Sequence, residues 1–104
     1  MRKAFVMKLY EGCGEEYKLR HDRLWPEMKR MLKEYGVISY SIFLNEATNE
    51  LFGYVELNNT EKWEEISNNE VNKEWWKYME DIMETGAESR PVTIDLLEVF
   101  HLKS

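Results

Sequence analysis

The sequence contains a single cysteine, only two prolines and no long run of apolar residues. Because a disulfide needs two cysteines, Cys13 cannot form an intrachain bridge. It lies between Gly12 and Gly14, where we interpret it as an incidental loop thiol rather than a nucleophile. No stretch reaches the roughly 20 apolar residues needed to cross a bilayer, and the first residues lack the features of a signal peptide. We therefore expect a cytoplasmic protein with no membrane partner.

Basic clusters and the common cofactor-binding motifs are also missing. The formal net charge is −6 and no Lys/Arg stripe is present, so we expect no nucleic acid partner. The two histidines, His21 and His101, stand alone, and no set of His, Cys, Asp and Glu has the spacing of metal ligands. There is no glycine-rich phosphate loop and no Ser-His-Asp order. We expect neither a metal nor any other cofactor.

What the sequence does contain is the pattern of one small globular domain. Its 104 residues are one domain's worth, and the 43% hydrophobic content is ordinary for a folded chain. Apolar alternation predicts strands, and spacings of three and four predict helices. The predicted strands cover 3–9, 37–44, 51–57 and 92–101; the predicted helices cover 15–35 (kinked or broken before Pro26), a short segment capped by Thr60, and 70–84.

This β-α-β-β-α-β order predicts an α+β fold of the ferredoxin-like type over residues 1–104, with helices on one face of a four-stranded antiparallel sheet. The strands, however, are apolar on both faces. In 37–44 the residues Ile38, Tyr40, Ile42 and Leu44 alternate with Val37 and Phe43, and in 51–57 Phe52 and Tyr54 oppose other apolar residues. Two helical segments can cover only one face. A second copy of the sheet is the simplest cover for the other, so we expect a face-to-face homodimer.

The first helical segment carries an unbroken stripe at spacings of four and three: Tyr17, His21, Leu24, Met28, Met31 and Tyr35. His21 therefore points toward the sheet, one turn from Tyr17. Two interpretations stay open at this point. His21 is either a core histidine held by a backbone or tyrosine hydrogen bond, or a general acid/base with a pKa near neutrality.

Three further aromatic residues each have a structural interpretation, as packed side chains, and a functional one, as contacts to a ligand. Tyr40 is either a packed aromatic with its hydroxyl at the rim or a donor to a polar ligand. Trp75 and Trp76 lie about 100° apart on a helix, which places Trp75 inward and Trp76 at the edge of the same face. Two indoles in so small a core are either ordinary packing or a platform for the C–H faces of a sugar ring.

Four motifs in this order resemble the L-rhamnose mutarotase family over nearly the whole chain. They are Glu16-Tyr17-x3-His21-x3-Trp25-Pro26-Glu27, Ser39-Tyr40-Ser41-Ile42, Trp75-Trp76-Lys77-Tyr78-Met79 and Glu98-Val99-Phe100. The resemblance implies a dimeric α+β barrel that interconverts the α and β anomers of L-rhamnose. It also implies that His21 is the catalytic acid/base and that Tyr17, Tyr40, Trp75 and Trp76 contact the sugar. Residues 86–90 match no motif.

The implied chemistry suits the residues present, because ring opening and closure need proton transfer but no redox group, metal or covalent intermediate. Two other functions are compatible with the fold: a small dimeric-barrel monooxygenase that uses His21 as an iron ligand or base, and a non-catalytic sugar-sensing module. The aromatic and histidine set favours the sugar enzyme.

Overall fold

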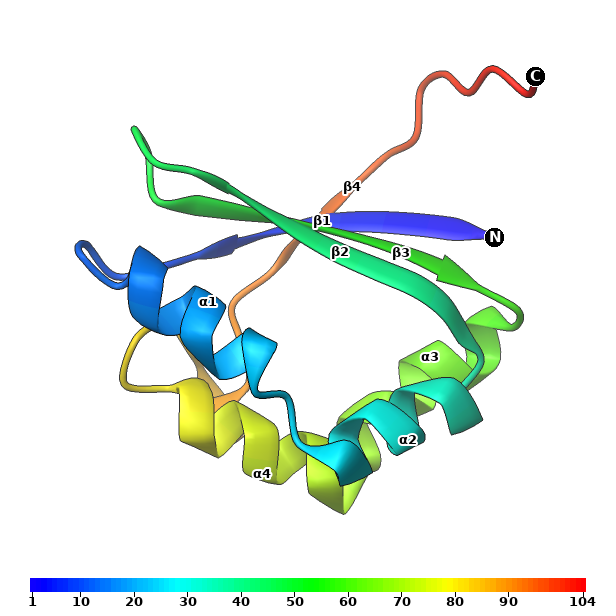
Figure 1. Cartoon of the computed structure of the whole chain (residues 1–104). Helices are drawn as coiled ribbons and strands as arrows, with labels where there is room; N and C mark the ends of the chain where they lie inside the picture. The colour runs from blue at the N-terminus through cyan, green and yellow to red at the C-terminus, as the bar shows by residue number, and fades with distance from the viewer.

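The computed structural model describes residues 1–104 as four strands, four α-helices and two 3₁₀ helices (Figure 1). The elements are β1 (Arg2–Lys8), α1 (Gly14–Asp22), α2 (Pro26–Glu34), β2 (Val37–Asn45), β3 (Glu50–Leu57), α3 (Thr60–Glu65), η1 (Ile66–Asn68), α4 (Glu70–Met79), η2 (Ala87–Ser89) and β4 (Ile94–Leu96). No helix is long and apolar enough to cross a membrane.

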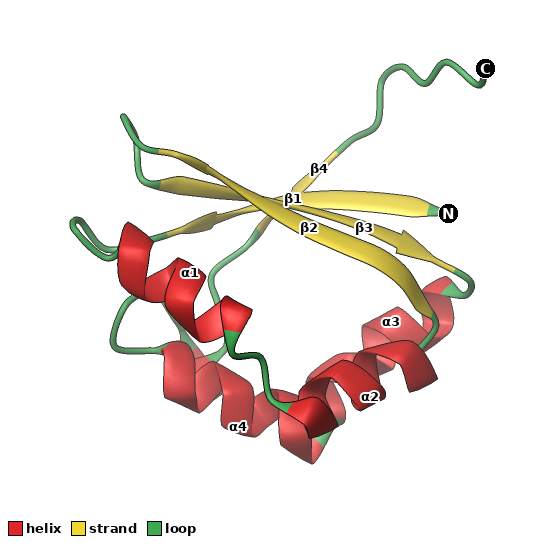
Figure 2. Ribbon diagram, viewed as in Figure 1, coloured by secondary structure: helices red, strands yellow, loops and turns green.

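The four strands form one antiparallel sheet in the order β2-β3-β1-β4. All of the helices lie on one side of it (Figure 2). The predicted ferredoxin-like α+β arrangement is confirmed. The predicted break before Pro26 is also confirmed: Trp25 is extended, and Pro26 opens α2 at the first helical position, where its missing N–H costs nothing.

Two helix boundaries differ from the prediction. Asn59, not Thr60, caps α3: its side-chain oxygen accepts hydrogen bonds from the backbone N–H of Glu61 at 2.8 Å and of Lys62 at 3.4 Å. The last long helix ends at Met79 rather than at residue 84. The residues after it pair with Lys8 and the residues that follow β1: the Tyr10 N–H donates to the carbonyl of Ile82, and the Glu84 N–H donates to the carbonyl of Lys8, both at 2.9 Å.

The last strand is also shorter than predicted, since only Ile94–Leu96 of the expected 92–101 is paired. These three residues lie at the sheet edge opposite Ala4–Val6. Beyond them the chain leaves the sheet as an extended tail (Figure 1). Val99 and Phe100 in this tail are exposed.

A register irregularity at the start of β2 overturns one predicted face. It places Val37 opposite Leu57, on the side covered by helices, so Val37 packs against the core. Ile38 is therefore not part of the inward row with Tyr40 and Ile42, and it is 59% exposed. A bulge of this kind shifts the side-chain alternation by one residue, which local alternation cannot anticipate.

Two rows of directly paired residues show how different the sheet faces are. One row crosses all four strands on the open face as Phe43, Phe52, Val6 and Ile94. These four residues are apolar, and Phe43 is 66% exposed. The row beside it on the helix-covered face is Ile42, Gly53, Phe5 and Asp95.

Gly53 is needed in that inner row because the Phe5 ring lies over it. A Cβ at Gly53 would stand 2.5 Å from two carbons of the Phe5 ring, which no side chain could accept without a shift. The ring in turn packs edge-on against Tyr40 at 6.2 Å between centroids and contacts Trp63. The absence of a side chain at Gly53 thus leaves room for the Phe5 ring, which packs against Tyr40.

Candidate active site

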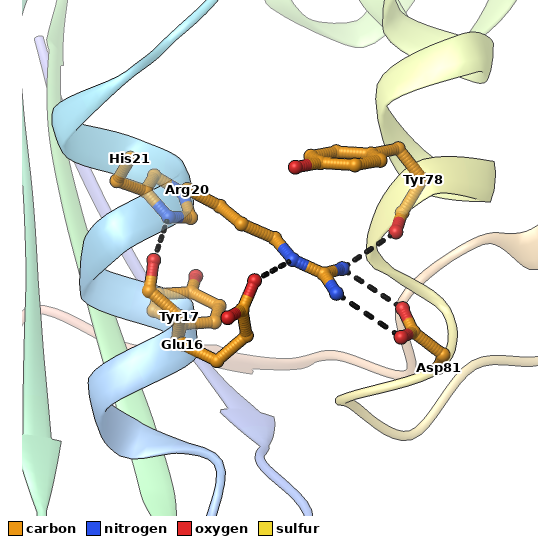
Figure 3. Close-up of polar contacts among 6 residues, drawn as sticks. All are labelled: Glu16, Tyr17, Arg20, His21, Tyr78 and Asp81. Carbon is orange, nitrogen blue, oxygen red and sulfur yellow. Dashed lines mark hydrogen bonds and ion pairs between the residues drawn. The ribbon is translucent and has the colours of Figure 1, made fainter.

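His21 lies in the last turn of α1, held by a hydrogen bond to its own helix. Its Nδ1 is 2.9 Å from the carbonyl oxygen of Tyr17 (Figure 3). A carbonyl can only accept, so Nδ1 carries the proton in the neutral ring. The other ring nitrogen, Nε2, then has a free lone pair and makes no hydrogen bond within the protein. This arrangement selects one tautomer and leaves Nε2 available for proton transfer.

Aromatic rings enclose the imidazole on two sides. The Tyr17 ring stacks on it with centroids 4.3 Å apart, and the Trp75 ring meets it edge-on at 5.3 Å. Burial disfavours the charged imidazolium and lowers the pKa of His21, more than the hydrogen bond to the Tyr17 carbonyl raises it. The neutral ring, which is the form that accepts a proton, is therefore favoured at pH 7.

Tyr17 and Tyr40 supply two phenol groups near this ring. Burial raises the pKa of both hydroxyls, so both stay protonated at any physiological pH. Neither hydroxyl is bonded to another protein group. They are consequently available as neutral hydrogen-bond donors and cannot act as bases.

Arg20 fixes α1 to the end of α4 (Figure 3). Its guanidinium donates to both carboxylate oxygens of Asp81 at 2.8 and 3.0 Å, to Glu16 at 2.7 Å and to the carbonyl of Tyr78 at 2.7 Å. The same group lies 4.6 Å from the centre of the Tyr78 ring. These bonds join the turn that carries His21 to the helix that carries the two tryptophans.

A cavity of about 1280 Å³ lies between the helices and the covered face of the sheet. The five residues predicted from the sequence line it together: Tyr17, His21, Tyr40, Trp75 and Trp76. As predicted, Trp75 is the deeper indole at 6% exposure, while Trp76 is half-buried and lies below the guanidinium of Arg90. Small-molecule pockets are typically about 300–1,000 Å³, so a monosaccharide would occupy only part of this space.

Several polar residues of the cavity were not anticipated. Asp95 reaches it because its pairing with Phe5 turns it toward the helices, while its apolar neighbours Ile94 and Leu96 face outward. Lys3 and Asn72 also line the cavity. No signal in the sequence pointed to Asp95, because an alternation of apolar Ile94 and Leu96 with a polar residue ordinarily turns the polar residue outward. No three His, Cys, Asp or Glu side chains lie close enough to share a metal ion.

A ferredoxin-like sheet, a cavity lined by phenols and indoles, and a histidine with one unbonded ring nitrogen describe a small α+β protein with an aromatic-lined ligand cavity. Residues 2–102 match the family model of L-rhamnose mutarotase. Two proteins named L-rhamnose mutarotase are similar to this chain: the one from Lachnoclostridium phytofermentans is 53% identical to it, and the one from Enterococcus faecalis is 50% identical. Each match covers 98% of this chain and at least 98% of the relative. The chain belongs to the L-rhamnose mutarotase family.

Solved structures agree with this assignment. The crystal structure of an L-rhamnose mutarotase from Formosa agariphila superposes with a TM-score of 0.92 at 46% identity, covering 99% of both chains. A dimeric ferredoxin-like protein from an uncultured marine organism, 14% identical with a TM-score of 0.63 over 99% of this chain and 96% of its own, shares the fold. Mutarotases interconvert sugar anomers and are isomerases, so the mutarotase predicted from the sequence is confirmed as the family of this chain.

Proposed function

We propose that this protein interconverts the α and β anomers of L-rhamnose inside the cavity, with His21 as the group that moves the proton. The observation that carries the proposal is the state of His21. Its Nδ1 proton is committed to the Tyr17 carbonyl at 2.9 Å, its burial favours the neutral ring, and its Nε2 is unbonded in a cavity-lining residue. These are the properties required of a general base.

His21 alone can both take up and return the proton that this reaction moves. Nε2 accepts the proton of the anomeric hydroxyl, the C1–O1 bond becomes a carbonyl, and the bond between C1 and the ring oxygen breaks. The resulting imidazolium returns the proton to the ring oxygen, giving the open-chain aldehyde. Rotation about C1–C2 followed by the reverse steps closes the ring on the other face of C1. His21 ends in the form in which it began.

Tyr17 and Tyr40 would orient the sugar by donating hydrogen bonds to its hydroxyls. Their raised pKa values keep both phenols protonated throughout. Because the stacked Tyr17 ring and the edge-on Trp75 ring restrict how the imidazole can rotate, the sugar is positioned against a base that is itself held in place. Trp76 would stack on one face of the sugar ring at the mouth of this site.

The two tryptophans are expected to respond differently to removal. Trp76→Ala should weaken L-rhamnose binding about tenfold, which is about 1.4 kcal/mol, with little change in stability, because its ring is half-buried at the cavity wall. Trp75→Ala should instead destabilise the fold by about 3 kcal/mol, since its ring is 6% exposed. NMR titration with the sugar and urea unfolding measure the two effects. Normal binding by Trp76→Ala would assign that indole to packing alone.

The activity is tested by saturation-transfer NMR on the anomeric protons of L-rhamnose. Saturating one anomer should reduce the signal of the other when the protein is present, well beyond the spontaneous exchange without it. D-glucose at the same concentration serves as the control sugar, because it carries a C6 hydroxyl and a different arrangement of ring hydroxyls. If the protein binds L-rhamnose but leaves the exchange rate unchanged, it is a sugar-sensing module and not an isomerase.

We also propose that the protein acts as a homodimer joined through the open sheet face. The two ends of the apolar row on this face are exposed in one chain, Phe43 at 66% and Ile94 at 65%, while Phe52 is partly buried and Val6 is buried between them. The marine protein that shares the fold is described as dimeric, which supports a dimer but does not identify its interface. A cytoplasmic location and the lack of a nucleic acid partner, suggested by the net charge of −6, stay predictions from the sequence.

A further inference from the structure

Asn72 is a buried polar residue without a partner for its amide. The side chain is 4% exposed, and its Nδ2 is the one buried side-chain nitrogen or oxygen in the protein that has no hydrogen bond. It also lines the cavity. Leaving a buried donor unpaired is unfavourable, and the few such groups in folded proteins often have a functional reason.

The structure offers no local reason for an amide at this position. Asn69, three residues earlier, is the cap of α4: its side-chain oxygen accepts from Val71 and Asn72 backbone N–H groups, and its Nδ2 donates to the Tyr35 hydroxyl. Asn69 is thus fully used by the fold. Asn72 comes after the cap, as a buried residue on the inward face of the helix.

The position of Asn72 relative to the site suggests what its amide is for. It precedes Trp75 and Trp76 by three and four residues, which places it one helical turn away on the same face of α4. Trp75 in turn contacts His21 edge-on at 5.3 Å. Asn72 therefore lies one turn from the indole that touches the proposed base, and both residues line the same cavity. Its Nδ2 is covered in the free protein, so the nitrogen reaches the cavity only when the amide turns about the Cβ–Cγ bond.

We propose that Asn72 determines substrate specificity: its side-chain amide turns toward the cavity when the sugar binds, and its Nδ2 donates a hydrogen bond to one ring hydroxyl. The inference rests on the proposed function of the cavity and adds to it a polar contact from α4. A sugar hydroxyl of the correct configuration accepts a hydrogen bond from the amide. An epimer, whose hydroxyl at that carbon points the other way, leaves the amide without a hydrogen bond.

The test is Asn72→Leu, which keeps the shape of the side chain and removes its donor. We expect the Kd for L-rhamnose, measured by NMR titration, to rise about 10-fold to 100-fold, while the urea midpoint stays the same or increases. Asn69→Ala is the matched control in the same helix turn. It should lower the urea midpoint through loss of the cap and leave the Kd nearly unchanged. If Asn72→Leu does not fold, Asn72→Ala takes its place in the titration.

Titrations of L-rhamnose and its 2-deoxy, 3-deoxy and 4-deoxy derivatives identify the contact. For one of them, the wild-type protein and the Asn72 variant should bind equally well, because the partner hydroxyl is already absent. An unchanged Kd for L-rhamnose in Asn72→Leu, or an equal loss for all four sugars, would overturn the inference. Since Kd is measured without turnover, a wild-type protein that binds L-rhamnose but does not exchange its anomers would refute the proposed isomerase activity and not the role of Asn72.

Discussion

His21→Ala is expected to reduce the protein-dependent exchange of L-rhamnose anomers by about 10²–10⁴-fold, the usual contribution of one general acid/base. The loss follows from the geometry: the variant has no Nε2, and the phenols of Tyr17 and Tyr40 hold their protons too strongly to replace it. His21→Asn should lose activity equally, since an amide does not exchange protons near neutral pH. Saturation-transfer NMR gives the rate, with the spontaneous exchange subtracted.

The matched control is His101→Ala, which removes the only other histidine from the exposed tail and should keep full activity. Circular dichroism and urea unfolding should show that His21→Ala is folded, so that the loss reflects chemistry. If His21→Ala exchanges the anomers at the wild-type rate, His21 is a packed core histidine and not the catalytic base.

The same assignment fixes the sign of the pH dependence. Exchange requires the neutral imidazole, and burial lowers the pKa of His21 below its ordinary value of about 6.5. Activity should therefore be level around pH 7 and fall as the pH drops through that lowered pKa, about tenfold for each further pH unit. A rate that rises on the acid side of neutrality, after subtraction of the uncatalysed reaction, would contradict a neutral base.

Phe43→Glu is expected to convert the proposed homodimer into monomers. Phe43 is 66% exposed in the single chain and pairs directly with Phe52 in the apolar row of the open sheet face. Burying one phenylalanine side chain is worth about 2 kcal/mol, and a symmetric interface contains it twice, so about 4 kcal/mol is lost. At about 1.4 kcal/mol for each factor of ten, the dimer Kd should rise about 10³-fold, before any cost of burying the new carboxylates.

Light scattering over a concentration series measures this change. Leu19→Glu is the control, because it places the same charge on a partly exposed apolar residue of α1, away from the open sheet face, and should leave the mass unchanged. The stability of a Phe43→Glu monomer should be close to that of an isolated wild-type chain, since most of this ring makes no contact within the chain. A wild-type protein that is monomeric at micromolar concentration would refute the dimer.

Local patterns in the sequence determined the elements and most of the candidate site. The spacing of Tyr17 and His21 places them together on any helix, and the observed structure stacks their rings. The difference in depth between Trp75 and Trp76 also follows from helix geometry. Alternation was sufficient for Phe43, Phe52 and Tyr54 on the open face. These features need only the chain's own periodicity.

Tertiary structure alone decided the features that depend on residues far apart in the chain. Val37 faces the core because of a bulge in its pairing with β3, and Asp95 enters the cavity because it is paired with Phe5, ninety positions earlier. Pairing register decides which face a side chain occupies, and it is set by contacts that local alternation does not contain. The unpaired amide of Asn72 is likewise visible only once the surrounding helices and sheet are in place.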